Sequence, residues 1–318
     1  MTSHIATDRR ANLAGSAWMV LAMAAFAVED VMIKAAGETL PLSQILVLFG
    51  LGGALLFATL ARLRGEALFS ADVLSRPMRI RMGFEICGRL FYALAIVLTP
   101  LSAATVILQA TPLVVVAGAA LIFGERVGWR RWMAIGIGLV GVLVILQPGT
   151  AAFSALSILA VLGMLGFAGR DLASRAAPAS LSALVLGFYG FVGILCAGGL
   201  YAAWERAAFV WPDASAWGWL TGAILAGVLA YGSLMRAMRT GEVSAVTPFR
   251  YTRLLFGVGL GVVFFGEGLS LTMIIGAALI VVSGLFILWR GASQRASANA
   301  CSRMSDNRSA SVCRNASG

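Results

Sequence analysis

Apolar residues form ten long, nearly continuous runs along the chain, separated by short polar segments. A helix needs about 20 apolar residues to cross the hydrocarbon core of a bilayer, and each run is close to that length. The pattern therefore predicts an all-α integral membrane protein with ten transmembrane helices. The runs cover 14–35, 43–61, 80–98, 101–122, 129–147, 154–173, 180–203, 215–236, 243–264 and 270–289.

Proline positions agree with these boundaries. Six of the eight prolines fall between runs, and proline ends helices because it lacks the backbone N–H donor. The other two, Pro112 and Pro248, lie within the fourth and ninth runs. There they predict a local kink or a loosened helix.

Composition excludes several classes of protein. Hydrophobic residues make up 60% of the 318 positions and charged residues 12%, whereas soluble domains have about 45–50% and 25%. An outer-membrane barrel would alternate apolar and polar residues. His4 and Lys34 are the sole histidine and lysine, so no Ser-His-Asp triad, buried metal site or Walker-type ATPase is expected. The cysteine spacing suggests no metal site, and no cofactor is expected.

The basic residues are distributed unevenly between the predicted loops. With the N-terminus inside, 18 of the 24, Arg81 among them, are assigned to cytoplasmic segments or the run ends beside them, two to the outer side, and four to the interior of runs. Cytoplasmic loops are enriched in Lys and Arg, so both termini are predicted to be cytoplasmic and the net charge of +10 requires no nucleic-acid partner. The excess of Arg over Lys indicates a bacterial protein, which would then be multi-pass in the cytoplasmic (inner) membrane.

The two halves of the chain resemble each other at an offset of 141–142 residues. Phe26–Ala36 aligns with Phe167–Ala177, and Ser102–Thr105 aligns with Ser244–Thr247. Each half holds five runs, and because five is odd the second copy enters the membrane from the opposite side. Such inverted repeats are common in secondary transporters, with the substrate site near the midplane. The predicted divisions are a cytoplasmic tail at 1–13, repeats at 14–149 and 150–290 around a central cavity, and a disordered cytoplasmic tail at 291–318.

Three further features carry a resemblance to a known family. The pairs Gly124-Glu125 and Gly266-Glu267 follow the fourth and ninth runs, Pro100–Ala104 opens the fourth run, and Thr247–Tyr251 lies in the ninth. In these features the chain resembles the EamA-type branch of the drug/metabolite transporter superfamily over about 12–290. The resemblance implies a ten-helix carrier with a central cavity. Known members move amino acids, nucleotide-sugars, drugs, riboflavin or S-adenosylmethionine, in either direction.

Ionisable residues within the runs are the candidate site, because each costs at least about 2.5–3.5 kcal/mol at the bilayer centre. Arg250 and Arg253 share a face of the ninth run beside Tyr251, and Arg253 falls close to the midplane. A guanidinium fork there suits a substrate carboxylate or phosphate, or else a buried bridge to Glu85 or Glu29. The proposed substrate-binding residues are Glu85, Arg89, Tyr92, Gln109, Arg250, Tyr251 and Arg253. The proposed coupling residues are Glu29, Asp30, Arg170 and Asp171.

Each of these positions also has a structural interpretation. Asp30 and Lys34, four residues apart, are expected to pair on one helix face, or Lys34 extends to the interface. Glu85 and Arg89 have the same spacing and form either an internal pair or, with Tyr92, a cavity wall. Glu29 is expected to be too far in depth from its repeat equivalent Arg170 for a direct bridge.

Other motifs are assigned to packing and turns. Gly136–Gly141 fits G-x-G-x-x-G but lies within a run, where small residues let helices approach; the same holds for Gly257 and Gly261. Glu125 and Glu267 are expected to cap a helix or fix a turn.

With Lys34 at the outer end of the first run included, five basic residues against four acidic ones within the runs favour a substrate with a carboxylate or another anionic group. Tyr92, Tyr189, Tyr231 and Tyr251 offer stacking faces for an aromatic group. The expected function is a secondary carrier working by alternating access, exporting an amino acid, with an aromatic one favoured. The partners are then a small-molecule substrate, the bilayer and, as one option for coupling, protons; a monomer is compatible with the sequence. The alternatives are uptake of S-adenosylmethionine or riboflavin, and an intramembrane enzyme.

Overall fold

The computed structural model describes residues 2–124, 128–147, 154–178, 180–240 and 246–305, and all regular structure among them is helical. The longer helices follow the predicted runs, because a backbone with apolar side chains satisfies its polar groups internally only as a helix when water is absent. The elements are α1 (Thr2–Ala36), α2 (Leu42–Leu63), η1 (Ala71–Leu74), α3 (Arg76–Leu98), α4 (Leu101–Leu108), α5 (Thr111–Phe123), α6 (Trp129–Leu146), α7 (Ser157–Arg175), α8 (Ala183–Glu205), α9 (Ala214–Thr240), η2 (Thr247–Tyr251), α11 (Thr252–Phe265) and α12 (Leu271–Ser305).

Among the described residues, six helical stretches are long and apolar enough to cross a membrane. They are Arg10–Ala36, Leu42–Leu63, Leu101–Ile122, Ser157–Ser174, Ala183–Glu205 and Ala214–Ala237. Trp132–Leu146 and Leu271–Ile287 are shorter apolar helices. Helix α3 is long enough but carries Arg81, Glu85 and Arg89, and α11 has 14 residues. The chain is therefore an α-helical protein built for a bilayer.

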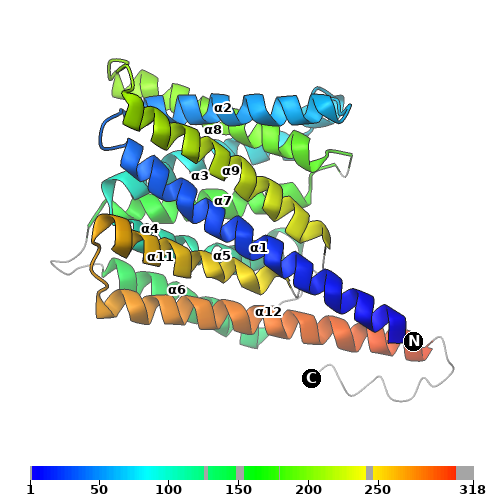
Figure 1. Ribbon diagram of the computed structural model, residues 1–318. Helices are drawn as coiled ribbons and strands as arrows, with labels where there is room; N and C mark the ends of the chain where they lie inside the picture. Colours follow the sequence, from blue (N-terminus) through cyan, green and yellow to red (C-terminus); the bar gives the residue numbers. More distant parts are fainter. Residues whose placement is uncertain (1, 125–127, 148–153, 179, 241–245, 306–318) are drawn as a thin grey trace.

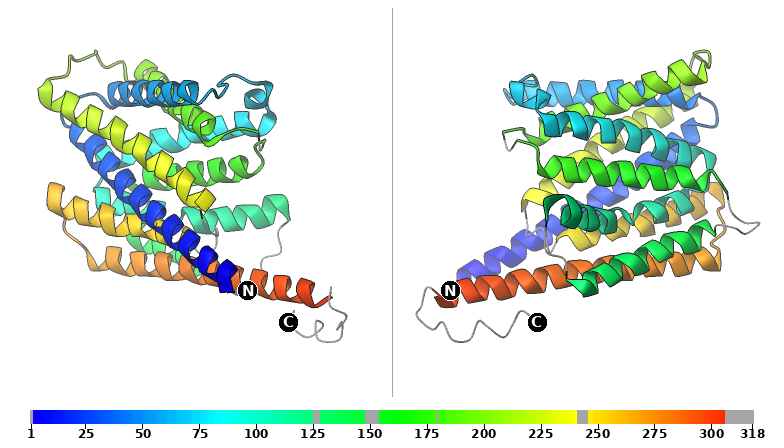
Figure 2. Two further views of the ribbon diagram at one scale, coloured as in Figure 1. Left: turned by 45° about the vertical axis from the view of Figure 1, so that its right-hand side comes forward. Right: turned by 180° about the vertical axis from the view of Figure 1, so that it is seen from behind.

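The helices lie side by side in one bundle (Figure 1), and those from the two halves of the chain pack against one another. The main contacts join α1 to α9, α2 to α8, α3 to α7, and α6 to α12; α4 packs on α11. Figure 2 shows the same pairs from two other sides. Small residues permit the close approaches: a Cβ on Gly166 would lie 2.4 Å from the Cα of Gly88 across the α3–α7 contact. Most of the contact surface in the bundle thus lies between the two halves.

Two of the predicted runs are interrupted near their middles. Pro112 has no N–H to donate to the carbonyl of Leu108, and the hydroxyl of Thr111 donates to that carbonyl at 2.5 Å instead. The chain therefore divides into α4 and α5 at Gln109 and Ala110. In the ninth run the proline-containing turn η2 precedes α11. Interrupted helices are tolerated at membrane depth where protein surrounds the freed groups.

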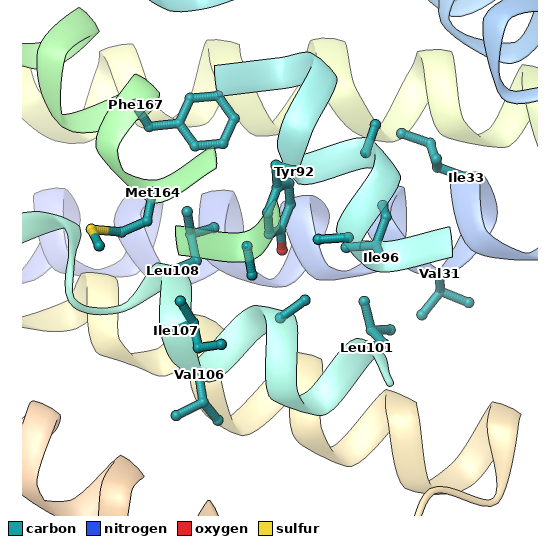
Figure 3. Packing of buried hydrophobic residues seen from close by; sticks show 14 of the residues in the cluster. Val31, Ile33, Tyr92, Ile96, Leu101, Val106, Ile107, Leu108, Met164 and Phe167 are labelled. Atoms are coloured by element: carbon teal, nitrogen blue, oxygen red, sulfur yellow. The ribbon is translucent and has the colours of Figure 1, made fainter. Parts of the chain in front are cut away.

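The core is centred on α3 and its neighbours. Tyr92 is 1% exposed and is among the largest fully buried side chains. Figure 3 shows Phe167 and Met164 of α7 on one side of Tyr92, and Leu108 and Ile107 of α4 on another. Its ring meets Phe167 edge to face at 5.8 Å. This packing fixes the α3 face that carries the charged residues described below.

The ends of the chain differ from the sequence expectation. Helix α1 begins at Thr2 and α12 continues to Ser305, whereas composition predicted a disordered tail from residue 291. Alanine, serine and arginine are tolerated in helices, and no proline stops α12. The beginning of α1 and the end of α12 lie at the same end of the bundle (Figures 1 and 2). Residues 306–318 and Glu125 lie outside the described part of the chain.

Candidate functional site

A buried ion pair joins α1 to α11. Arg253 donates from Nη2 to Oδ2 of Asp30 at 2.7 Å, and the hydroxyl of Tyr92 donates to the same oxygen at 3.0 Å. Asp30 is 1% exposed. The guanidinium carbon of Arg253 lies 5.1 Å from the ring centre of Phe26 and 5.6 Å from that of Tyr92. Aromatic faces and a carboxylate therefore replace water around this cation.

A second pair lies one residue away along α1. Arg89 of α3 donates from Nη1 to Oε1 of Glu29 at 2.7 Å. The guanidinium carbon of Arg89 lies 5.6 Å from the ring centre of Phe49 and 5.9 Å from that of Phe167. Glu29 is as buried as Asp30. We call these four charged residues, Glu29, Asp30, Arg89 and Arg253, the α1 cluster; its formal charges balance.

Another set of charges links α3, α7 and η2. Glu85 lies 3.8 Å from Arg81 and 3.4 Å from Arg170. Arg170 also contacts Asp171 at 2.9 Å, and Asp171 lies 3.7 Å from Arg250. The result is a chain of alternating charges, Arg81–Glu85–Arg170–Asp171–Arg250, which we call the α7 cluster. It contains three cations and two anions.

Arg81 is a residue that sequence reasoning missed, because it was counted among the loop arginines. It is 3% exposed, and it donates to the hydroxyl of Ser174 at 3.0 Å and to the hydroxyl of Tyr231 at 3.3 Å. It also donates to the carbonyl of Leu186 at 3.4 Å. Its position four residues before Glu85, on the same helix face, was the available signal. Arg81 thus connects α3 with α7, α8 and α9.

The two helix interruptions meet at the remaining candidates. Gln109, at the α4–α5 break, donates to the backbone carbonyl of Arg250 at 3.1 Å. Tyr251 is buried against α12, where a Cβ on Gly284 would overlap its hydroxyl oxygen. Gly257 and Gly261 of α11 face Thr105 and Ser102 of α4, as the packing assignment predicted. The interrupted segments therefore contact each other directly.

Lys34 and Glu267 occupy one end of the bundle. The carboxylate of Glu267 accepts from the backbone N–H groups of Leu101 and Ser102 at 2.6 and 2.8 Å, and from the hydroxyl of Ser102 at 2.6 Å. These are the first N–H groups of α4, which have no partner within the helix. Lys34 donates to the carbonyls of Ile96 and Thr99 and lies 3.8 Å from Glu267. Glu267 thus caps α4 from across the bundle.

Several sequence-based pairings are wrong in detail. Asp30 binds Arg253 and Tyr92 instead of Lys34, and Lys34 is tied to carbonyls instead of extending freely to an interface. Arg89 binds Glu29 instead of Glu85. The bridge that the span-nine arginines make is to Asp30 and Asp171 instead of Glu85 or Glu29. The expected Asp30–Lys34 and Glu85–Arg89 pairs each lie on one helix, whereas Asp30 and Arg89 take their observed charged partners from other helices.

Buried polar atoms without a hydrogen-bond partner occur in both clusters. In the α1 cluster they are the acceptors Glu29 Oε2 and Asp30 Oδ1 and the donors Arg89 Nε and Arg253 Nε. In the α7 cluster they are Arg81 Nη1 and Glu85 Oε2. A buried polar atom without a partner costs about 1–3 kcal/mol. The arrangement can therefore accept a polar ligand or water at these atoms. No group of three or more His, Cys, Asp or Glu side chains in the described residues could hold a metal ion.

Buried charges between the packed halves of a bundle of apolar helices are typical of multi-pass membrane proteins that move polar substrates. The EamA-like transporter family model matches residues 13–147 and again 155–289, and the chain belongs to this family. Because the members of this family are transporters, the alternative of an intramembrane enzyme is excluded.

Bacterial relatives cover most of the chain. The pseudopaline exporter CntI of Pseudomonas aeruginosa (strain UCBPP-PA14) is 30% identical over 266 residues, 83% of this chain and 92% of the relative. The S-adenosylmethionine uptake transporter of Rickettsia prowazekii is 24% identical over 87% of this chain and 93% of its own length. The riboflavin transporter of Rhizobium johnstonii is 28% identical over 89% and 94%. A solved structure described as "Crystal structure of protein" shares the fold, with a TM-score of 0.60, 20% identity, and coverage of 88% of this chain and 98% of the other.

Proposed function

We propose that the protein is a secondary carrier that exports an amino-acid-type metabolite across the bacterial cytoplasmic membrane. In this proposal ten helices form two inverted five-helix repeats, 14–149 and 150–290, and both termini are cytoplasmic. Substrate binds between the repeats near the midplane. Alternating access exposes the site to one side of the membrane at a time.

The packing pattern supports the two-repeat architecture. In the two-repeat scheme α7 is the counterpart of α1, and α9 is the counterpart of α3. The α1–α9 contact therefore corresponds to the α3–α7 contact, and both are extensive. Exchanging each helix for its counterpart leaves the α2–α8, α4–α11 and α6–α12 contacts unchanged. The α4–α5 break at Gln109–Ala110 and the η2–α11 junction at Tyr251–Thr252 lie 142 residues apart. The same 142 residues separate Gly124 and Gly266, which both have a left-handed backbone conformation. Equivalent interruptions in two halves are a typical pointer to a transporter site.

The α1 cluster is the single observation that carries the substrate class. It offers buried acceptors on Glu29 and Asp30 and buried donors on Arg89 and Arg253, all without partners. An amino-acid headgroup presents an ammonium to such acceptors and a carboxylate to such donors. Because the cluster is formally neutral, a zwitterion enters without leaving uncompensated charge in the interior.

Two of the four tyrosines expected to offer stacking faces, Tyr92 and Tyr251, do not extend this argument to an aromatic substrate. Tyr92 is enclosed by the core and donates to Asp30, and Tyr251 is packed against α12. Neither presents a free face for stacking. The proposal is therefore limited to the amino-acid headgroup and makes no claim about an aromatic side chain.

Proton coupling is assigned to Glu29. Its carboxylate is buried, bonds one arginine and keeps one oxygen without a partner. Protonation would weaken the Arg89 bond and would remove one charge from the α1 cluster. In this scheme a proton and the substrate ammonium compete for the same carboxylate, which is the requirement for antiport.

A thermal-shift screen of the purified protein tests the substrate class. The panel contains the common amino acids, riboflavin and S-adenosylmethionine, the latter two because relatives carry those names. We expect amino acids to raise the melting temperature, and their methyl esters and N-acetyl derivatives to have a much smaller effect. A shift with riboflavin or S-adenosylmethionine and none with amino acids would favour uptake of those compounds and refute the proposal.

A further inference from the structure

The α7 cluster has a charge composition that the α1 cluster lacks. Arg81, Arg170 and Arg250 share two carboxylates, Glu85 and Asp171, in four contacts, two within a helix and two between neighbouring elements. One positive charge is therefore formally in excess. Arg250 and Arg170 are partly open to solvent, with side chains 30% and 20% exposed, whereas Arg81 is 3% exposed. Because Arg81 is the most buried of the three arginines, solvent screens the excess positive charge least at this residue.

Arg81 also has unused hydrogen-bonding capacity. Its Nη1 group is buried and has no partner, while Nε and Nη2 bind Ser174, Leu186 and Tyr231. Its carboxylate contact, to Glu85, is 3.8 Å long. Three hydrogen bonds from the guanidinium thus go to uncharged acceptors. They fix the position of the guanidinium without neutralising its charge. A buried arginine held in this way suits an anionic group of a ligand.

Arg81 and Arg89 lie eight residues apart on α3, which corresponds to about 12 Å along the helix axis. One amino-acid headgroup is too short to reach both clusters. We propose that the α7 cluster binds a second anionic group of the substrate at Arg81, while the α1 cluster binds the headgroup. The inference rests on the proposed function and narrows it to an acidic amino-acid-type metabolite with two separated anionic groups.

A homologous series of probes tests this inference. The series runs from L-glutamate through L-2-aminoadipate and L-2-aminopimelate to L-2-aminosuberate, each compared with its ω-amide. Binding is measured by thermal shift and by isothermal calorimetry on the whole protein. For the best-fitting length, we expect the acid to bind at least about tenfold more tightly than the amide, since a charge-assisted hydrogen bond supplies that difference.

Variants assign the preference to Arg81. Arg81→Gln should bring the acid-to-amide ratio close to one, and Arg81→Lys should give an intermediate ratio because it keeps the charge without the fork. Arg79→Gln is the matched control, an exposed arginine two residues away on α3, and should keep the wild-type ratio. A ratio is insensitive to general destabilisation, and Arg81→Lys keeps the test available if Arg81→Gln does not fold.

The outcomes separate this inference from the function on which it rests. Equal binding of acids and amides by the wild type, or an unchanged ratio in Arg81→Gln, overturns the role of Arg81 while the headgroup proposal stands. Acids that bind through Arg81 but are not transported overturn the carrier function and leave the anion site. If no member of the series binds while other amino acids raise the melting temperature, the role of Arg81 is overturned and the headgroup proposal stands; if no amino acid of either set binds, both are overturned.

Discussion

The cap that Glu267 places on α4 gives the most quantitative prediction. Glu267→Ala removes an acceptor from two backbone N–H groups and from the hydroxyl of Ser102. Loss of a capping acceptor costs about 0.5–2 kcal/mol, and hydrogen bonds within membrane proteins average about 0.6 kcal/mol each. The Lys34 contact at 3.8 Å adds little. We therefore expect Glu267→Ala to lower the free energy of unfolding by about 2–3 kcal/mol.

Variants of the residues around Glu267 show how much each contact contributes to the expected loss in the free energy of unfolding. Ser102→Ala removes one hydrogen bond and should cost about 0.6–1 kcal/mol. The double variant should be no less stable than Glu267→Ala, because the serine hydroxyl and the carboxylate share one bond. Gly261→Ala should approach the effect of Glu267→Ala, since its Cβ would lie 2.5 Å from the Ser102 hydroxyl and 2.7 Å from Oε2 of Glu267.

The assay is unfolding in mixed micelles by titration with sodium dodecyl sulfate, followed by circular dichroism. Glu38→Ala is the control, because it removes an exposed carboxylate near the same end of α1; it should change stability by less than about 0.5 kcal/mol. The reasoning is refuted if Glu267→Ala is no less stable than Ser102→Ala. Additive losses in the double variant would also refute it.

Three further predictions concern the charged clusters and the interrupted ninth run. Arg253→Ala should reduce transport in proteoliposomes at least about tenfold at unchanged membrane expression, because a charge-assisted bond to substrate is lost. Normal transport rates in this variant would show that Arg253 does not bind the substrate. Glu29→Gln should abolish dependence of transport on a pH gradient while sparing exchange at equal pH, and retained dependence would assign coupling elsewhere. Gly284→Ala should lower the free energy of unfolding by about 1–3 kcal/mol, because the added Cβ would overlap Tyr251. The control Gly259→Ala should be tolerated, since a Cβ there meets nothing within 4 Å. Equal melting curves for the two variants would contradict the packing of Tyr251 against α12.

The sequence predicted the helical membrane class well because lipid imposes one strong requirement, an apolar stretch that satisfies its own backbone. It also indicated which residues are costly inside a membrane. Pro112 marked an interrupted run, and the structure shows how the hydroxyl of Thr111 takes over the carbonyl that proline leaves. Local rules were sufficient for such features.

Ion pairing could not be predicted in the same way. The i, i+4 spacing of Asp30 with Lys34 and of Glu85 with Arg89 suggested pairs on one helix, but helices packed alongside supplied better partners. Such partners depend on which helix faces meet, and hydrophobicity within a lipid-spanning bundle says little about that. Arg81 was missed for a related reason: loop-by-loop counting treated a buried side chain as a marker of orientation.

Counterflow in proteoliposomes tests the central claim most directly, namely that substrate crosses by alternating access at a site between the two halves. Vesicles holding the purified protein are loaded with unlabelled compound, chosen as the one with the largest thermal shift, and are diluted into a trace of the labelled form. The account predicts transient, saturable accumulation of label that requires compound inside. Flux that rises linearly with concentration, or label that never exceeds equilibrium, would contradict it.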